Sequence, residues 1–158
     1  MFISQLTDSQ RSNLITRFNR LLKDYSSVQE MLEFIKHCWT FDKGGERSGT
    51  SVAWLNLLMA CSSSRRELYS LVKEELHPIK NERFSLFEMY HTYHGHIPMA
   101  NNDPEMALDI LYRVIIKDTP RHILDEVRTV LYQVKKIRPE LEKNSRYVRL
   151  LEIVSGVQ

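Results

Sequence analysis

The densest group of residues that could do chemistry is a histidine cluster, His91, His94 and His96, in the segment HTYHGH. On a helix, His91 and His94 would share a face, and His96 could fold back past Gly95 to complete a three-nitrogen zinc site. The helix dipole alone also favours histidines near the end of a helix, and no fourth ligand is evident. We therefore expect no metal and no cofactor, and we keep these histidines as weak metal candidates.

Two Glu-x-x-His pairs, Glu74-His77 and Glu88-His91, have the spacing of ligands in di-iron helix bundles. In such bundles a whole helix separates the two pairs, and each pair lies in the middle of its helix. Here the pairs are 14 residues apart, and His77 directly precedes Pro78 at an expected helix end. We interpret the pairs as coincidental.

The segment GGERSGTS, from Gly44 to Ser51, almost fits a phosphate-binding loop. Thr50 stands where that motif needs its lysine, so we expect an ordinary surface loop. Cys38 follows His37, but neighbouring helical residues do not face each other, and neither Gly-x-Ser-x-Gly nor His-Glu-x-x-His occurs. The sequence thus predicts that the protein is not an enzyme.

An aromatic segment gives the clearest functional signal. We expect a helix from Arg83 to His94, whose aromatic and methionine side chains spread over more than one face. These residue types are enriched at protein interfaces. The alternative is that this helix is central and buried. The predicted partner-binding residues are Phe84, Phe87, Tyr90, Tyr93, Ile97 and Met99.

A mildly basic stretch from 121 to 149 gives the alternative function, nucleic-acid binding. Its tyrosines, Tyr132 and Tyr147, could stack on bases while cations contact phosphates. A solvated helix surface would explain the same residues. The cations predicted for this function are Arg121, Arg128, Lys135, Lys136, Arg146 and Arg149.

Composition indicates one globular domain. The chain has 158 residues, 42% hydrophobic content and only five glycines, which argues against a turn-rich β fold. The 22 basic and 20 acidic residues nearly cancel. The two cysteines lie in apolar contexts, no signal peptide is evident, and the longest apolar run, Val52 to Cys61, is too short to span a bilayer. We expect an intracellular, soluble protein that does not enter a membrane.

In the first half, three capping boxes predict helix starts, at Thr7, Ser27 and Ser64. The second of these helices runs to about Trp39, and Phe41–Gly49 is a predicted flexible loop. The segment that begins at Thr50 or Ser51 and runs to Cys61 is apolar on nearly every side, so we expect a buried helix. Ser62 to Ser64 is either a turn or part of one continuous helix, and His77-Pro78 ends the helix that carries Leu68 and Leu71.

In the second half, prolines mark helix starts. Asp103-Pro104 and Thr119-Pro120 each join a capping residue to a proline at the first helical position. The expected helices, 104–117 and 120–137, should form an antiparallel hairpin because their joint is so short. A last helix or pair of helices covers 139–154, 155–158 is a frayed tail, and 95–102 is a loop.

These patterns together predict an all-α fold, a compact single-domain bundle of about seven helices over residues 1–158, with a C-terminal antiparallel helical hairpin. The predicted function is a non-enzymatic protein-interaction or regulatory module of adaptor type. Its partner would be another protein or a second copy of the chain. The alternative is a helical nucleic-acid-binding protein. No family is assigned from the sequence.

Overall fold

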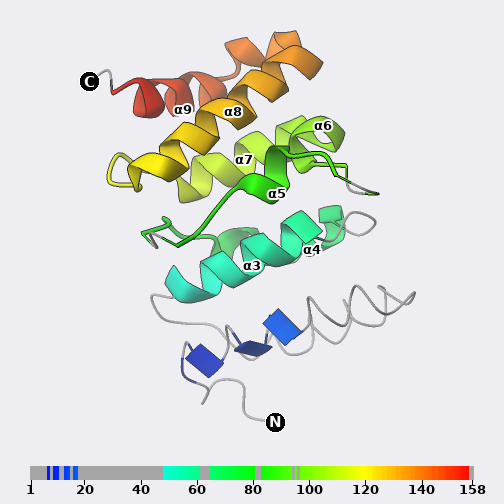
Figure 1. Cartoon of the computed structure of the whole chain (residues 1–158), viewed down its shortest axis with the longest axis vertical. Helices are drawn as coiled ribbons and strands as arrows, with labels where there is room; N and C mark the ends of the chain where they lie inside the picture. Colours follow the sequence, from blue (N-terminus) through cyan, green and yellow to red (C-terminus); the bar gives the residue numbers. More distant parts are fainter. Residues whose placement is uncertain are drawn as a thin grey trace. The chain divides into compact units, whose positions relative to one another are not determined.

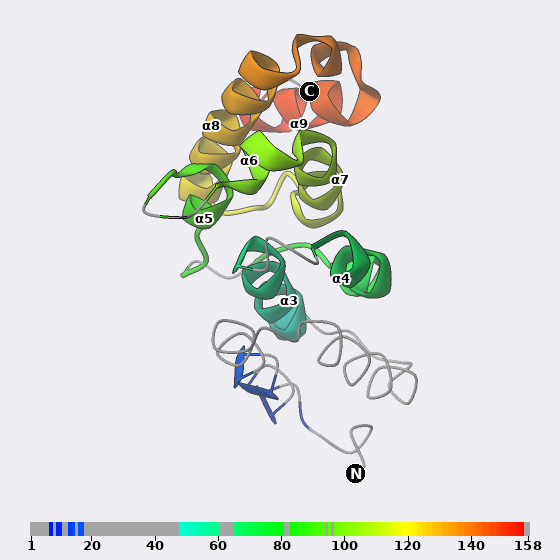
Figure 2. The same cartoon turned by 90° about the vertical axis from the view of Figure 1, so that its right-hand side faces the viewer.

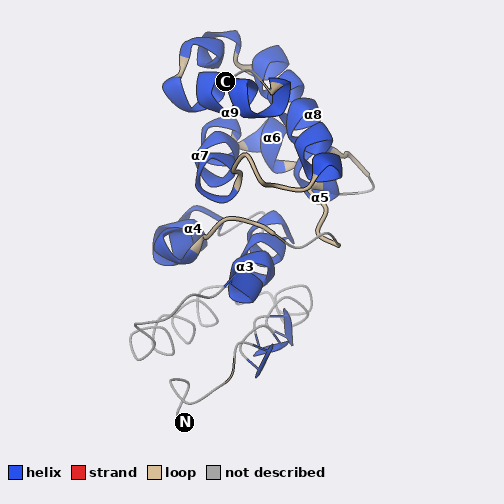
Figure 3. Cartoon of the chain, turned by 90° about the vertical axis from the view of Figure 1, so that its left-hand side faces the viewer, coloured by secondary structure: helices blue, strands red, loops and turns tan. Residues whose placement is uncertain are grey.

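The computed structural model describes residues 7, 9–10, 13–14, 16–17, 48–60, 65–80, 83–93, 95 and 97–156. The described residues 9–10, 13–14 and 16–17 are helical, and from residue 48 on the described regular elements are seven α-helices and two short 3-10 helices (Figure 1; Figure 3). The predicted all-α fold is therefore confirmed for the described part of the chain. Contacts group the chain into two compact units, Met1–His77 and Pro78–Gln158, and a single domain over 1–158 stays a prediction.

The first capping box is formed as predicted. The backbone N–H of Thr7 donates to Gln10 Oε1 at 2.9 Å, and the backbone N–H of Gln10 donates to Thr7 Oγ1 at 3.3 Å. Each side chain thus satisfies a backbone donor that a helix start leaves without a partner. The second capping box, the helix to Trp39 and positions 41–47 of the predicted loop lie outside the described residues.

Helix α3 (Ser48–Ala60) is buried almost all round, as its apolar sequence predicts. It begins before Thr50, so the prediction that Ser48 and Gly49 belong to the loop is wrong. Glycine lowers helix propensity without forbidding helix, and tertiary context overrides a cost of about 1 kcal/mol. Its fully buried large side chains are Trp54, Leu55, Leu57, Leu58 and Met59.

Two polar side chains, Arg65 and Ser51, form hydrogen bonds between α3 and the residues that follow it in this first unit. Arg65, at the start of α4 (Arg65–Val72), is buried and donates from Nε to the Leu58 carbonyl at 2.8 Å, which satisfies an acceptor in the last turn of α3. After the 3-10 turn η2 (Lys73–Glu75), the backbone N–H of His77 donates to Ser51 Oγ at 2.7 Å, and that hydroxyl donates to the His77 carbonyl. The chain is therefore tied back to α3 just before Pro78.

The second unit contains six elements. They are α5 (Phe87–Tyr90), α6 (Met99–Asn102), α7 (Pro104–Val114), α8 (Arg121–Ile137), the 3-10 helix η3 (Pro139–Lys143) and α9 (Ser145–Ser155). Helix α9 packs on both α7 and α8, while α5 and α6 pack on α8 (Figure 2). The buried faces of α7 and α8 follow the predicted apolar stripes and form the core of this unit.

The proline positions are confirmed only in part. Pro104 opens α7 as predicted, but the Asp103 side chain makes no capping hydrogen bond. Pro120 precedes α8 rather than lying inside it, and Thr119 is not its cap. Thr119 instead closes the preceding turn, because its Oγ1 accepts the N–H of Ile116 at 2.9 Å. The Thr119 hydroxyl therefore accepts from the N–H of Ile116 and not from an N–H at the start of α8.

The ends of the last helices also differ from expectation. Helix α7 ends at Val114, so 115–120 connects α7 to α8, and the antiparallel hairpin stays a prediction. Pro139 is the first residue of the 3-10 helix η3. Asn144 caps α9, because its side chain accepts the N–H of Arg146 at 2.9 Å. The predicted frayed tail is wrong at Ser155, which is helical, and at Gly156, whose φ of 68° makes the left-handed cap that glycine favours.

Candidate protein-interaction surface

The predicted helix from Arg83 to His94 is wrong, because only the single turn α5 is helical. The residues on both sides of it, 84–86 and 91–93, are not helical, although the N–H of His91 still donates to the Phe87 carbonyl at 2.9 Å and so ends the turn. Burial here alternates in and out from Phe84 to Phe87, a period of two rather than 3.6. The predicted loop 95–102 is also wrong in its second half, where Met99–Asn102 forms α6.

Burial divides the aromatic segment into two sets. Phe84 and Met99 lie in the core of the second unit with Leu86 and Met89. The prediction that Phe84 and Met99 contact a partner is therefore wrong for this structure, because both are covered by the chain itself.

The other predicted residues lie at the surface. Phe87, Tyr93 and Ile97 expose 43%, 45% and 59% of their area, and Tyr90 is half-buried. The Phe87 ring stacks on the exposed His91 ring, with 4.3 Å between centroids and 27° between planes. It also meets Tyr90 edge-on at 5.8 Å. We name these five residues, Phe87, Tyr90, His91, Tyr93 and Ile97, the α5 surface.

One carboxylate of α8 holds the backbone that carries the α5 surface. Glu126 accepts the N–H of Leu86 at 2.6 Å and the hydroxyl of Ser85 at 2.7 Å. Ser85 Oγ in turn accepts the N–H of Phe87 at 3.1 Å. A single helical turn is unstable by itself. The hydrogen bonds from Glu126 of α8 therefore stabilise a turn that is too short to be stable alone.

Two more side chains of α8 extend this anchor. Gln133 Nε2 donates to the Tyr90 carbonyl at 2.8 Å, and His122 Nε2 lies 3.3 Å from the Phe84 carbonyl. The contacts span the segment from Phe84 to Tyr90 and run from His122, near the start of α8, to Gln133 in its second half; α5 lies beside α8 in Figure 2. Sequence reasoning missed all three α8 residues, because polar side chains on a helix carry no signal of a partner 36 to 43 positions away.

The surface tyrosines are held as neutral donors. Partial burial, and then the nearby Glu126 carboxylate, raise the pKa of Tyr90 above its ordinary value of 10.0. For Tyr93 the main cause of a raised pKa is its hydrogen bond to Glu88, with 2.5 Å between Oη and Oε2. Both hydroxyls remain protonated at neutral pH, and each donates its hydrogen to a carboxylate of the chain, Tyr90 to Glu126 and Tyr93 to Glu88.

The histidine cluster is only partly described. His91 is exposed and lies against Phe87, whereas His94 and His96 lie outside the described residues. Within the part of the chain that the structure describes, no group of three histidine, cysteine or acidic residues is arranged to hold a metal ion. Of the two Glu-x-x-His pairs, Glu88 accepts from Tyr93, and His77 uses its backbone to bind Ser51.

The predicted basic face consists largely of ion pairs. Arg121 and Arg128 both approach Asp125 on α8, and Lys135 Nζ lies 2.7 Å from Glu142 Oε1 of η3. On α9, Arg149 lies 3.1 Å from Glu152. Four of the six predicted cations thus lie beside three carboxylates close to them in sequence, because Arg121 and Arg128 share Asp125.

The remaining two cations differ from each other. Arg146 crosses from α9 to Asp109 of α7 at 3.1 Å, and Lys136 is exposed on α8. Of the tyrosines that could stack on bases, Tyr132 exposes 69% of its area. Tyr147 is buried, so its predicted stacking role is wrong for this structure. The face therefore offers one exposed aromatic ring, Tyr132, among cations of which most are paired with carboxylates.

No protein-family model matches this chain, and neither a curated protein nor a solved structure matches it significantly. None of the helices in the described ranges has the length and apolar character needed to cross a membrane.

Proposed function

We propose that this chain is a non-enzymatic protein-interaction module and that the α5 surface contacts the partner. The observation that carries the proposal is the cluster of rings at Phe87, Tyr90 and His91, displayed on a segment that hydrogen bonds from α8 hold. Aromatic side chains of this kind supply most of the binding energy at protein interfaces.

The anchoring to α8 supports the same proposal. Binding through a mobile loop costs conformational entropy, whereas a segment already held by hydrogen bonds loses less on association. Phe87 offers apolar area, while the hydroxyls of Tyr90 and Tyr93 already donate to Glu126 and Glu88 of the same chain. The partner is another protein or a second copy of the chain, and it presents an apolar depression that covers the exposed rings.

The first experiment measures self-association. Sedimentation equilibrium over a range of concentrations compares the wild-type chain with Phe87→Asp and with Tyr132→Asp, a matched change at an exposed ring on α8. If a second copy is the partner, Phe87→Asp weakens association by about tenfold or more, as expected for an interface hot spot, and Tyr132→Asp leaves it unchanged.

The second experiment tests for another protein. A photo-crosslinking amino acid replaces Phe87 in one sample and Tyr132 in another, in the cells that make the protein. We expect a defined adduct from position 87 and none from position 132. Equal adducts from both positions, together with a monomer at every concentration, would contradict the proposal, and circular dichroism shows whether each variant is folded.

Nucleic-acid binding is the competing outcome. Fluorescence anisotropy with labelled single-stranded and double-stranded probes is measured at two salt concentrations. Since binding to phosphates releases counterions, an affinity that falls steeply with salt and with Lys136→Gln would favour the basic face over the α5 surface. Flat titrations in low salt are the result expected from the proposal.

A further inference from the structure

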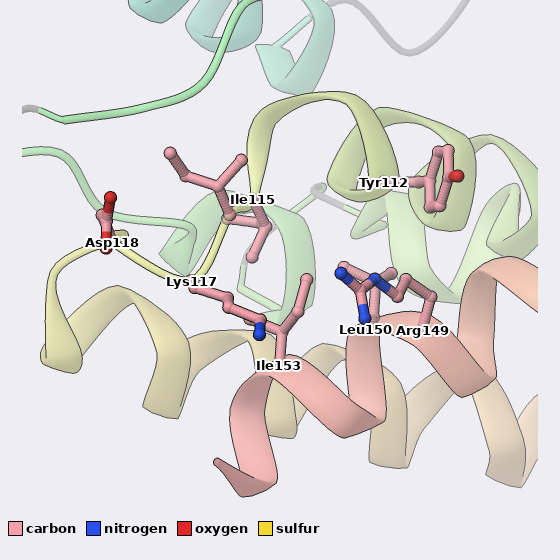
Figure 4. A pocket seen from close by; sticks show the side chains of 8 residues that line it. Tyr112, Ile115, Lys117, Asp118, Arg149, Leu150 and Ile153 are labelled. Carbon is pink, nitrogen blue, oxygen red and sulfur yellow. The ribbon is translucent and has the colours of Figure 1, made fainter. Parts of the chain in front are cut away.

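A pocket of about 430 Å³ lies in the second unit, away from the residues of the α5 surface (Figure 4). It is formed by the end of α7, the turn that follows and one side of α9. This volume is within the range of natural small-molecule sites. Its lining residues are Tyr112, Ile115, Ile116, Lys117, Asp118, Arg149, Leu150 and Ile153.

The pocket has an apolar base. Ile115 and Leu150 are buried, and Ile153 is half-buried beside them. The turn that forms one wall is fixed, because both the N–H and the hydroxyl of Thr119 bond to Ile116. The space is therefore bounded by a closed turn and a packed helix, so its shape is formed before any ligand binds.

Its rim is aromatic and mainly basic. Tyr112 exposes half of its area on one wall, and Figure 4 shows Lys117 and Arg149 on the side of Ile153, with Asp118 at the end far from Arg149. The pair between Arg149 and Glu152 is half-exposed on both sides. Such a pair contributes little, so Arg149 can exchange its partner.

The neighbouring acid on α7 is already compensated. Asp109, whose side chain is only 15% exposed, lies 3.3 Å from Arg113 and 3.1 Å from Arg146. Among the residues that line the pocket, the two cations Lys117 and Arg149 outnumber the one carboxylate, Asp118. An anion at the rim therefore meets a net positive charge.

We infer that this pocket binds a small amphipathic anion. Its ring system lies on Ile115, Leu150 and Ile153 against Tyr112, and its charged group lies between Lys117 and Arg149. A ring suits the exposed Tyr112 face, and two cations suit a carboxylate, sulfonate or phosphate. This site is independent of the proposed interaction surface.

The test compares two probes that differ in one group. Anilinonaphthalene sulfonate has a ring system and an anionic group, and N-phenylnaphthylamine is its neutral counterpart. Fluorescence titrations give the affinities, and backbone NMR shifts give the location. We expect the sulfonate to bind more tightly, with shifts centred on 112–118 and 149–153.

Three variants separate the contributions. Lys117→Gln and Arg149→Gln each weaken binding of the sulfonate by about two- to fivefold, the scale of one exposed charge, and leave the neutral probe unchanged. Lys136→Gln is the matched control, an exposed cation on α8 outside the pocket, and it changes neither probe. Ile153→Trp fills the base and blocks both probes.

The inference is overturned if Lys136→Gln weakens sulfonate binding as much as Arg149→Gln. It is also overturned if the shifts centre on the α5 surface, or if both probes bind wild type and Ile153→Trp equally. Far-ultraviolet circular dichroism of each variant keeps loss of fold distinct from loss of the site, and because Lys117 and Arg149 are exposed, their variants remain folded.

Discussion

The α5 surface and the face formed by α7 and α9 display their side chains in opposite ways. On the α5 surface, exposed rings project from a backbone that buried and polar groups of α8 hold. On the α7 and α9 face, exposed charges such as Arg146 and Arg149 meet carboxylates of their own or a neighbouring helix. The difference shows that charges at a surface can balance each other, whereas rings at a surface gain little until something covers them.

The largest expected effect lies beneath the α5 surface. Met89 is fully buried and Phe87, two positions earlier, exposes 43% of its area. Met89→Ala should lower the free energy of unfolding by about 2–5 kcal/mol, because it leaves a cavity in the core. Phe87→Ala should cost about 1 kcal/mol or less. Urea denaturation of both variants checks the prediction, and similar losses would show that Phe87 is a core residue.

The next effect concerns the carboxylate that holds α5. Glu126→Ala removes the acceptor of the Leu86 N–H and should lower the free energy of unfolding by about 1–3 kcal/mol. Its neighbour Asp125 is the matched control, because it is exposed and forms only surface ion pairs with Arg121 and Arg128. Asp125→Ala should cost below about 1 kcal/mol. Hydrogen exchange at Leu86 should quicken in the first variant alone.

A smaller effect separates caps from ion pairs on α9. Asn144→Ala removes the side chain that accepts the N–H of Arg146 and should cost about 1 kcal/mol. Arg149→Ala breaks an exposed pair with Glu152 and should cost about 0.5 kcal/mol or less. Thermal unfolding at low and high salt distinguishes them, since only the ion pair is screened. Equal costs would mean that the α9 charges hold the fold.

The smallest expected effect is a loss of stability at alkaline pH. Because the pKa values of Tyr90 and Tyr93 are raised above 10.0, the folded chain holds these protons more tightly than the unfolded chain. Their contribution to stability is complete below pH 10 and is lost as the pH rises through the folded-state pKa values. Urea denaturation above and below pH 10 should show stability falling with pH. The double variant Tyr90→Phe and Tyr93→Phe should flatten that slope, and an unchanged slope would assign it to other groups.

Sequence patterns were most reliable where a single element decides its own structure. Four confirmed features depend only on residues a few positions apart. They are the reciprocal capping at Thr7, the apolar residues all round α3, the apolar stripe of α8 and the proline at the start of α7. The predicted helix caps at Asp103 and Thr119 were wrong. The Asp103 side chain makes no capping hydrogen bond, and the Thr119 hydroxyl accepts the N–H of Ile116 in the preceding turn.

The candidate site was less accessible to the same reasoning. The exposed positions Phe87, Tyr93 and Ile97 belong to the predicted set, but Phe84 and Met99 could not be separated from them by residue type. The prediction assumed a helical period of 3.6 residues, whereas burial alternates with a period of two from Phe84 to Phe87. The hydrogen bonds that impose that alternation come from Glu126, 40 positions away from Leu86.

The sequence by itself determined the all-α class and the position of the long helices of the second unit, because apolar spacing and proline chemistry act over a turn or two. Only the tertiary structure decided which aromatic residues face outward and where a pocket opens between α7 and α9. Those outcomes depend on packing and hydrogen bonds between distant segments, since α5 is too short to hold its conformation without α8.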